Sequence, residues 1–140
     1  MRALILGLLL FTGATQATCE KSVLLGNVDY AKNSSYFSTQ DSLQLDKIVA
    51  DNSDNSSGYL LLEFNMDKSI GDEDLQKYNM WLANRRIERV KEYLTAAHFS
   101  HPIVTRIRTA THKDNREVSL HWCNNQQMMR RLKSQAPPNN

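Results

Sequence analysis

The sequence predicts an α+β domain, in which one small sheet packs against two helices that lie on a single face of it. Two patterns support this prediction. Several short segments are either continuously apolar or alternate between apolar and polar residues, which is typical of strands. Two other segments repeat apolar residues every three or four positions, which is typical of amphipathic helices. Along the chain these segments give the order strand, helix, strand, helix, strand, strand.

Residues 1–17 have the features of an export signal. Arg2 gives a positive start, Ala3 to Phe11 form an apolar run, and Thr15-Gln16-Ala17 is a cleavage site with small residues. The apolar run is shorter than the roughly 20 residues that a membrane-spanning helix needs. We therefore predict a signal peptide that is removed after Ala17. The alternative is a lipoprotein, in which Cys19 carries the lipid.

The first strand is expected over Ser22 to Val28, and after an interruption near Asn33 it is expected to continue to Phe37. Ser38-Thr39-Gln40-Asp41 has the S-x-x-D form of a helix start, with an acid in the first turn. Apolar residues then follow at helical spacing. The first helix is therefore predicted from Gln40 to Ala50.

Tyr59 to Phe64 is a continuous apolar run between turn residues, as expected of a central strand. Asn65 to Gly71 is expected to be a loop, and the acids of Asp72-Glu73-Asp74 mark the start of the second helix. His101-Pro102 is expected to end that helix. The stripe predicted to face the core consists of Leu82, Ala83, Ile87, Val90, Leu94 and Ala97.

The last two strands are predicted over Ile103 to Thr109 and Glu117 to Trp122, because apolar and polar residues alternate in both. Lys113-Asp114-Asn115 between them has turn composition, so we expect the two strands to form a hairpin. The chain becomes polar after Cys123. These boundaries predict one domain over residues 18–123 and a polar tail over residues 124–140.

The chain contains two cysteines, Cys19 and Cys123. Export places them in an oxidising compartment, where a Cys19–Cys123 disulfide is expected. It would close a loop of roughly 100 residues, which in the chain-entropy model stabilises the fold by about 4 kcal/mol. The alternatives are two unpaired thiols or a bridge between two molecules.

Charge and motifs exclude several classes of function. Removal of residues 1–17 lowers the formal net charge from +2 to +1, which gives no reason to expect a nucleic acid or an anionic membrane surface as partner. His98 and His101 are spaced by one helical turn, but no neighbouring residue completes a metal site. No nucleophile–base pair, phosphate loop or carboxylate dyad is visible. We expect no cofactor and no catalytic activity.

Three parts of the sequence are similar to the OmpA-like domain family. Residues 79–86 match its helix signature, N-x-x-L-S-x-x-R, at Asn79, Leu82 and Arg86, with Ala83 in place of the serine. Residues 61–67 stand where the family has its central strand and aspartate, and residues 115–118 resemble the start of its last strand, N-R-R-V. The resemblance covers residues 24–122 and implies the family's βαβαββ sandwich.

In that family the aspartate and the helix arginine hold the diaminopimelate of a peptidoglycan stem peptide. The resemblance therefore implies a ligand site at Asp67 and Arg86, with Asn79 and Arg116 beside it. Diaminopimelate carries an ammonium and a carboxylate on one centre, which an acid and a guanidinium can bind together. The alternative for Arg86 is that it lies in solvent with Arg85 and Arg89 on the outer face of the helix.

The resemblance implies a periplasmic, non-catalytic domain that binds peptidoglycan and tethers itself or an envelope complex to the cell wall, without inserting in the membrane after signal cleavage. The alternative is a protein–protein interaction subunit of a secretion, pilus or motor assembly that has lost peptidoglycan binding. Three departures from the family count against a simple transfer of the site: the long separation of Asp67 from Asn79, the bulky Phe64 and Met66 before the aspartate, and the short segment of residues 110–114 between the last two strands. Trp81 is expected either to pack under a loop or to be exposed for a partner.

Overall fold

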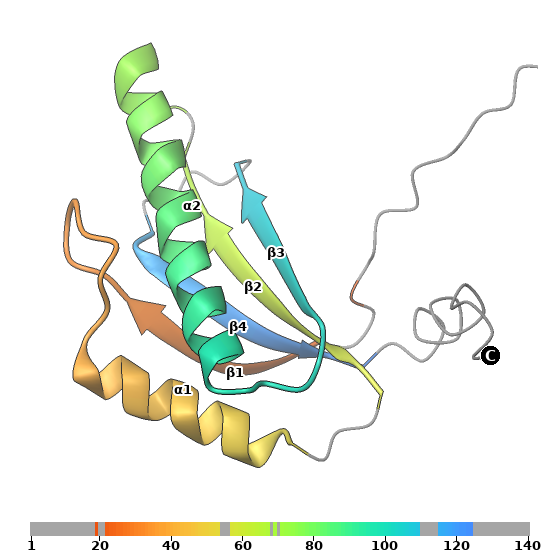
Figure 1. Cartoon of the computed structure of the whole chain (residues 1–140). Coiled ribbons are helices and arrows are strands. Elements are labelled where there is room, and N and C mark those ends of the chain that lie inside the picture. The colour runs from red at the N-terminus through yellow and green to blue at the C-terminus, as the bar shows by residue number, and fades with distance from the viewer. Residues whose placement is uncertain are drawn as a thin grey trace, which may run out of the picture.

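A computed structural model describes residue 19 and residues 22–53, 57–67, 69, 71–109 and 115–124 of the chain. The predicted signal peptide, nearly all of the polar tail and the predicted turn at residues 113 and 114 lie outside these residues. The elements follow the predicted order (Figure 1). They are β1 (Ser22–Asp29), α1 (Thr39–Asp51), β2 (Tyr59–Asn65), α2 (Glu73–Ala96), β3 (Ile103–Arg108) and β4 (Glu117–Cys123).

The four strands form one mixed sheet in the order β1-β4-β2-β3. β2 and β3 are parallel, and β4 runs antiparallel to both β1 and β2. The parallel pair requires a long crossover connection, which α2 provides. β1 and β3 are therefore the two edges of the sheet among the described strands.

The prediction of a hairpin between the last two strands is wrong, because β4 lies on the far side of β2 from β3. β2 is buried along almost its whole length, and it lies inside the sheet with β3 on one edge and β4 on the other. β3 exposes Thr105, Arg106 and Arg108, which suits an edge strand. Alternation within each strand shows which residues share a face, but it does not show which strands pair.

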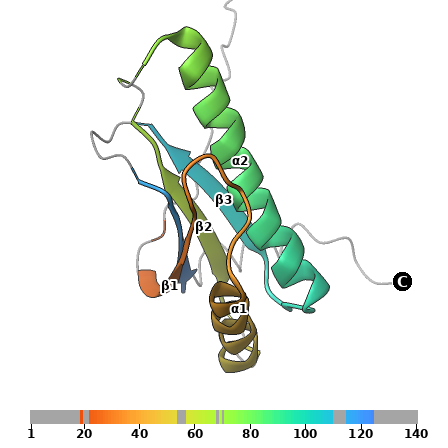
Figure 2. The same cartoon turned by 90° about the vertical axis from the view of Figure 1, so that its left-hand side faces the viewer.

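Both helices pack on the same face of the sheet, as predicted (Figure 2). The core between the helices and the sheet is one cluster of apolar side chains, and its burial is the main stabilising contribution to the fold. α1 and α2 contribute Leu45, Ile48, Ala83, Ile87, Val90 and Leu94, and the strands contribute Val28, Leu60, Leu62, Phe64, Val118 and Leu120. Ala97, the last member of the predicted stripe, is only half-buried at the end of α2.

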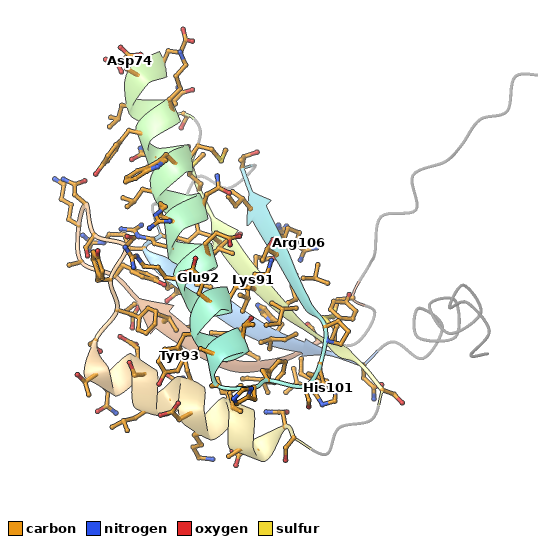
Figure 3. The ribbon with its side chains drawn as sticks, in the orientation of Figure 1. Asp74, Lys91, Glu92, Tyr93, His101 and Arg106 are labelled. Atoms are coloured by element: carbon orange, nitrogen blue, oxygen red, sulfur yellow. A yellow bond between two sulfur atoms is a disulfide. The ribbon has the colours of Figure 1, made fainter. Side chains whose placement is uncertain are left out.

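The opposite face of the sheet carries the predicted disulfide and an ion pair whose acid, Glu63, is buried while its basic partners are exposed. Cys19 and Cys123 are joined, with their Cα atoms 5.5 Å apart, so the prediction of an intramolecular disulfide is confirmed. Glu63 of β2 is only 6% exposed, and its Oε2 accepts a hydrogen bond of 2.6 Å from Arg106 Nε of β3. Arg106 is labelled on β3 in Figure 3. Arg108 Nη1 lies 3.6 Å from the other carboxylate oxygen of Glu63, Oε1. These contacts join the two parallel strands.

The helix starts agree with the predictions, and one helix end does not. Ser38 and Asp41 form a reciprocal capping box at the start of α1. Asp72 caps α2 by accepting a 2.9 Å hydrogen bond from the backbone N–H of Leu75. α2 ends at Ala96, before the predicted stop at residues 101–102, because His98 takes a left-handed conformation (φ 62°) that terminates the helix.

The predicted continuation of the first strand to Phe37 is also wrong. β1 ends at Asp29, and residues 30–38 form a loop that turns at Asn33, whose φ is 58°. Asparagine tolerates this left-handed conformation better than most residues. The loop folds over α2 instead of extending the sheet, and this places it beside the candidate site described below. No helix within the described residues is long and apolar enough to cross a membrane.

Candidate functional site

A cavity of about 460 Å³ lies between the first half of α2, the end of β2 and the loops that contain residues 32–33 and 115–116. All four residues that the sequence predicts as ligand-binding line it: Asp67, Asn79, Arg86 and Arg116. They come from three parts of the chain, since Asn79 and Arg86 both lie on α2, and the fold brings them together. The other lining residues are Lys32, Asn33, Phe64, Met66, Leu75, Leu82 and Asn115.

Arg86 is almost completely buried, with 4% of its surface exposed. Its Nε donates to the carbonyl oxygen of Ser34 at 2.9 Å, and its Nη2 donates to that of Ala31 at 3.2 Å. The guanidinium also lies over the rings of Tyr30 (5.1 Å) and Phe64 (5.6 Å). The alternative that Arg86 lies in solvent on the outer face of the helix is therefore wrong. These contacts hold the guanidinium in one position at the wall of the cavity.

Tyr30 completes the attachment of the loop to α2. Its hydroxyl donates a 3.0 Å hydrogen bond to the carbonyl oxygen of Arg86, and its own backbone N–H donates to the carbonyl oxygen of Arg116 at 3.0 Å. Burial raises the pKa of Tyr30 above its ordinary value, although the guanidinium of Arg86 opposes this rise. Tyr30 therefore remains a neutral donor at physiological pH and ties α2, the loop and the start of β4 together.

Asp67 lies just after β2 and is half-buried at the edge of the cavity. Its Oδ1 accepts hydrogen bonds from the backbone N–H of Ser69 at 2.8 Å and from the Ser69 hydroxyl at 2.5 Å. A side chain that bonds to the backbone two residues ahead stabilises a local turn. This turn fixes the orientation of the carboxylate at the entrance to the loop between β2 and α2.

Asn79 and Arg116 line the cavity from two different elements. Asn79 is half-buried on α2, two helical turns before Arg86, so both project from the same side of the helix. Arg116 is exposed immediately before β4. Lys32, which the sequence did not single out, is exposed on the loop and lines the cavity as well. The predicted interruption near Asn33 gave the only indication of a turn at this place.

The cavity therefore combines one carboxylate with three basic side chains, Lys32, Arg86 and Arg116, on a partly apolar floor. Phe64 and Met66 belong to this floor, but both are buried in the core. Such a site can hold a zwitterion, because the acid binds an ammonium and the basic groups bind carboxylates. The described residues contain no group of three His, Cys, Asp or Glu side chains that could hold a metal ion.

Solved structures show which known fold this arrangement matches. The OmpA-like domain of FopA1 from Francisella tularensis superimposes with a TM-score of 0.56 at 15% sequence identity, covering 71% of this chain and 71% of that one. The chain has the OmpA-like fold. The peptidoglycan-associated lipoprotein from Burkholderia pseudomallei matches this chain with a TM-score of 0.53 at 18% identity, covering 69% of this chain and 88% of that one.

Sequence comparison alone does not reach this result: no model of a known protein family matches the chain, and none of the curated proteins matches it either. The chain shares the OmpA-like fold with the two solved structures, although most of its residues differ from theirs. The residues that could bind a ligand must therefore be judged from the cavity of this chain itself.

Proposed function

We propose that this OmpA-like domain binds peptidoglycan noncovalently, by holding the diaminopimelate of a stem peptide in the cavity. The observation that carries the proposal is that Asp67, Asn79, Arg86 and Arg116 all line this one space. Its volume, about 460 Å³, lies within the range of roughly 300–1,000 Å³ that is usual for small-ligand sites. A single amino-acid side chain with both charges is a suitable occupant, whereas a folded protein partner is not.

Each charge of the ligand has a matching group in the cavity. Asp67 accepts hydrogen bonds from the ammonium, and its turn with Ser69 keeps the carboxylate in place before the ligand arrives. Arg86 attracts the carboxylate on the same ligand centre with a guanidinium that loop carbonyls and two rings already hold. A group fixed in advance loses little conformational entropy on binding. Lys32 and Arg116, which are both exposed, attract the remaining carboxylates of the stem peptide.

The domain acts, in this proposal, in the periplasm as a non-catalytic tether of itself or of an envelope complex to the cell wall. The likeness to a peptidoglycan-associated lipoprotein supports this role through the shared fold. Binding through one side chain of a repeating polymer needs only moderate affinity, because many identical sites lie close together on the wall.

A calorimetric titration with two peptides tests the proposal. The first peptide is a stem peptide that contains diaminopimelate, and the second has lysine at the same position and so lacks the extra carboxylate. The wild-type protein should bind the first peptide at least tenfold more tightly, since a hydrogen bond to a charged group contributes about 1.5–3 kcal/mol. Equal affinity for both would contradict the assignment of the basic groups.

Asp67→Asn removes the charge but keeps an oxygen that can accept from Ser69, so the turn should survive. This variant should bind the first peptide about tenfold more weakly. Asp74→Asn is the matched control, because Asp74 lies exposed in the first turn of α2 and does not line the cavity. If the wild-type protein binds neither peptide nor purified cell-wall sacculi, the proposal is wrong and the protein-interaction alternative gains support.

A further inference from the structure

An exposed pair of aromatic rings lies near the start of α2. Tyr78 is 39% exposed and Trp81 is 55% exposed, and their ring centroids are 5.8 Å apart with 31° between the ring planes. This half of α2 extends beyond the end of the sheet, as the position of Asp74 at its tip shows (Figure 3). Neither ring belongs to the core clusters of the described residues. We refer to Tyr78 and Trp81 as the aromatic platform.

The aromatic platform adjoins the cavity. Tyr78 directly precedes Asn79 and Trp81 directly precedes Leu82, and both of these neighbours line the cavity. One residue turns an α-helix by about 100°, so the platform lies on the flank of α2 next to the lining residues and away from the core. Leu75, three residues before Tyr78, lines the cavity and is itself partly exposed. An apolar surface therefore leads from the cavity wall to the platform.

The size of the platform indicates a small ligand. Two rings that are each about half exposed offer on the order of 200 Å². A stable protein interface needs about 800 Å² from each partner. A pyranose ring, whose C–H groups form a flat apolar face, fits this area. Lys77 and Arg85 lie one helical turn before and after Trp81. Their N–H groups can donate hydrogen bonds to the hydroxyl groups at the edge of a sugar ring.

We propose that the aromatic platform binds one amino-sugar ring of the glycan strand, next to the stem peptide held in the cavity. This inference rests on the proposed function. In peptidoglycan the stem peptide is attached to a sugar through a lactyl group, with two residues before diaminopimelate, a span of roughly 10 Å. Along the helix axis, Trp81 and Tyr78 lie about 8 Å and 12 Å from Arg86. A ligand anchored in the cavity can therefore reach the platform with its sugar.

The test compares a diaminopimelate stem peptide with the same peptide attached to its disaccharide, by calorimetry on the purified protein. The wild-type protein should bind the disaccharide-peptide about threefold to tenfold more tightly than the peptide alone. Trp81→Ala should remove this difference while its affinity for the peptide alone stays unchanged. Tyr36→Ala is the matched control, because Tyr36 is an exposed aromatic residue whose ring face Arg89 already covers at 3.7 Å.

The wild-type protein offers a second readout without any variant. Trp81 is exposed and Trp122 is buried, so a sugar on the platform should change the tryptophan fluorescence, and the peptide alone should change it little. Equal affinity of the wild-type protein for the two ligands would overturn the platform and leave the proposed function intact. Binding of neither ligand would overturn both. The proposal for the platform is also wrong if Trp81→Ala lowers the affinity for both ligands by the same factor. It is wrong as well if Trp81→Ala leaves both affinities unchanged and abolishes self-association in sedimentation.

Discussion

Arg86→Ala is the most informative test of the fold around the candidate site. The substitution removes the guanidinium that joins α2 to the loop of residues 30–34. It leaves the backbone of α2 unchanged, because alanine is a good helix former. The loop would lose the attachment that Arg86 provides. It would keep the bond from Tyr30 to the carbonyl oxygen of residue 86 and the 3.0 Å bond from Arg89 to Ser35.

The expected magnitude follows from the contacts that are lost. Two hydrogen bonds from a charged donor, at 2.9 Å and 3.2 Å, are worth about 1.5–3 kcal/mol each. The cation–π contacts with Tyr30 and Phe64 add about 0.5–2 kcal/mol each. The cost of burying the guanidinium offsets part of this, and Ala31 is exposed, so water can reach its carbonyl group. We expect the free energy of unfolding to fall by about 3 kcal/mol.

Urea unfolding followed by circular dichroism measures this change directly. For a domain of this size, a loss of about 3 kcal/mol also lowers the Tm by roughly 15 °C. Arg85→Ala is the control, because Arg85 is a half-buried arginine one position earlier on the same helix, and its loss should change stability by no more than about 0.5 kcal/mol. If the two variants unfold at the same urea concentration, Arg86 does not hold the loop and the reasoning is refuted.

Three further predictions concern stability. Cys19→Ser should lower the free energy of unfolding by about 4 kcal/mol, since the disulfide closes a sequence separation of 104, and wild-type protein in reductant should show the same loss. Ser38→Ala should cost about 1 kcal/mol by removing the cap of α1, whereas Ser38→Thr should retain most of it in the same urea titration. The folded protein holds Tyr30 protonated above its ordinary pKa of 10.0, so stability should fall as the pH rises past that value. Tyr30→Phe should show a shallower fall between pH values of about 9 and 11, and an equal slope would contradict this assignment.

The sequence predicts elements well where burial follows a regular period. Apart from Ala97, the stripe of α2 is buried as expected, and so is the continuous run of β2, because a helix or a strand places every residue of such a pattern on a known face. The pattern of apolar residues does not show which strands pair with each other. The position of β4 between β1 and β2 depends on long-range packing, and the alternation in Glu117 to Trp122 is compatible with either side of the sheet.

The candidate site shows the same limit. The resemblance placed Asp67, Asn79, Arg86 and Arg116 together, and the structure brings them to one cavity. The helical spacing placed Arg86 beside the apolar stripe, but it did not show that Arg86 is buried, since burial is imposed by a loop more than 50 residues earlier in the chain. Lys32 was missed for the same reason, because its position depends on how that loop folds back over α2.

The strand order has a consequence for how the domain is made. Among the described strands, β1 has β4 as its only hydrogen-bonded neighbour. The first strand to be synthesised therefore cannot pair until the last strand has been synthesised. A chain that stops before Glu117 contains β2 and β3 as a pair, β1 without a partner and Cys19 without its bonding cysteine. Long-range pairings of this kind form late in folding. The growing chain therefore cannot complete its sheet or close its disulfide until its final strand has been made.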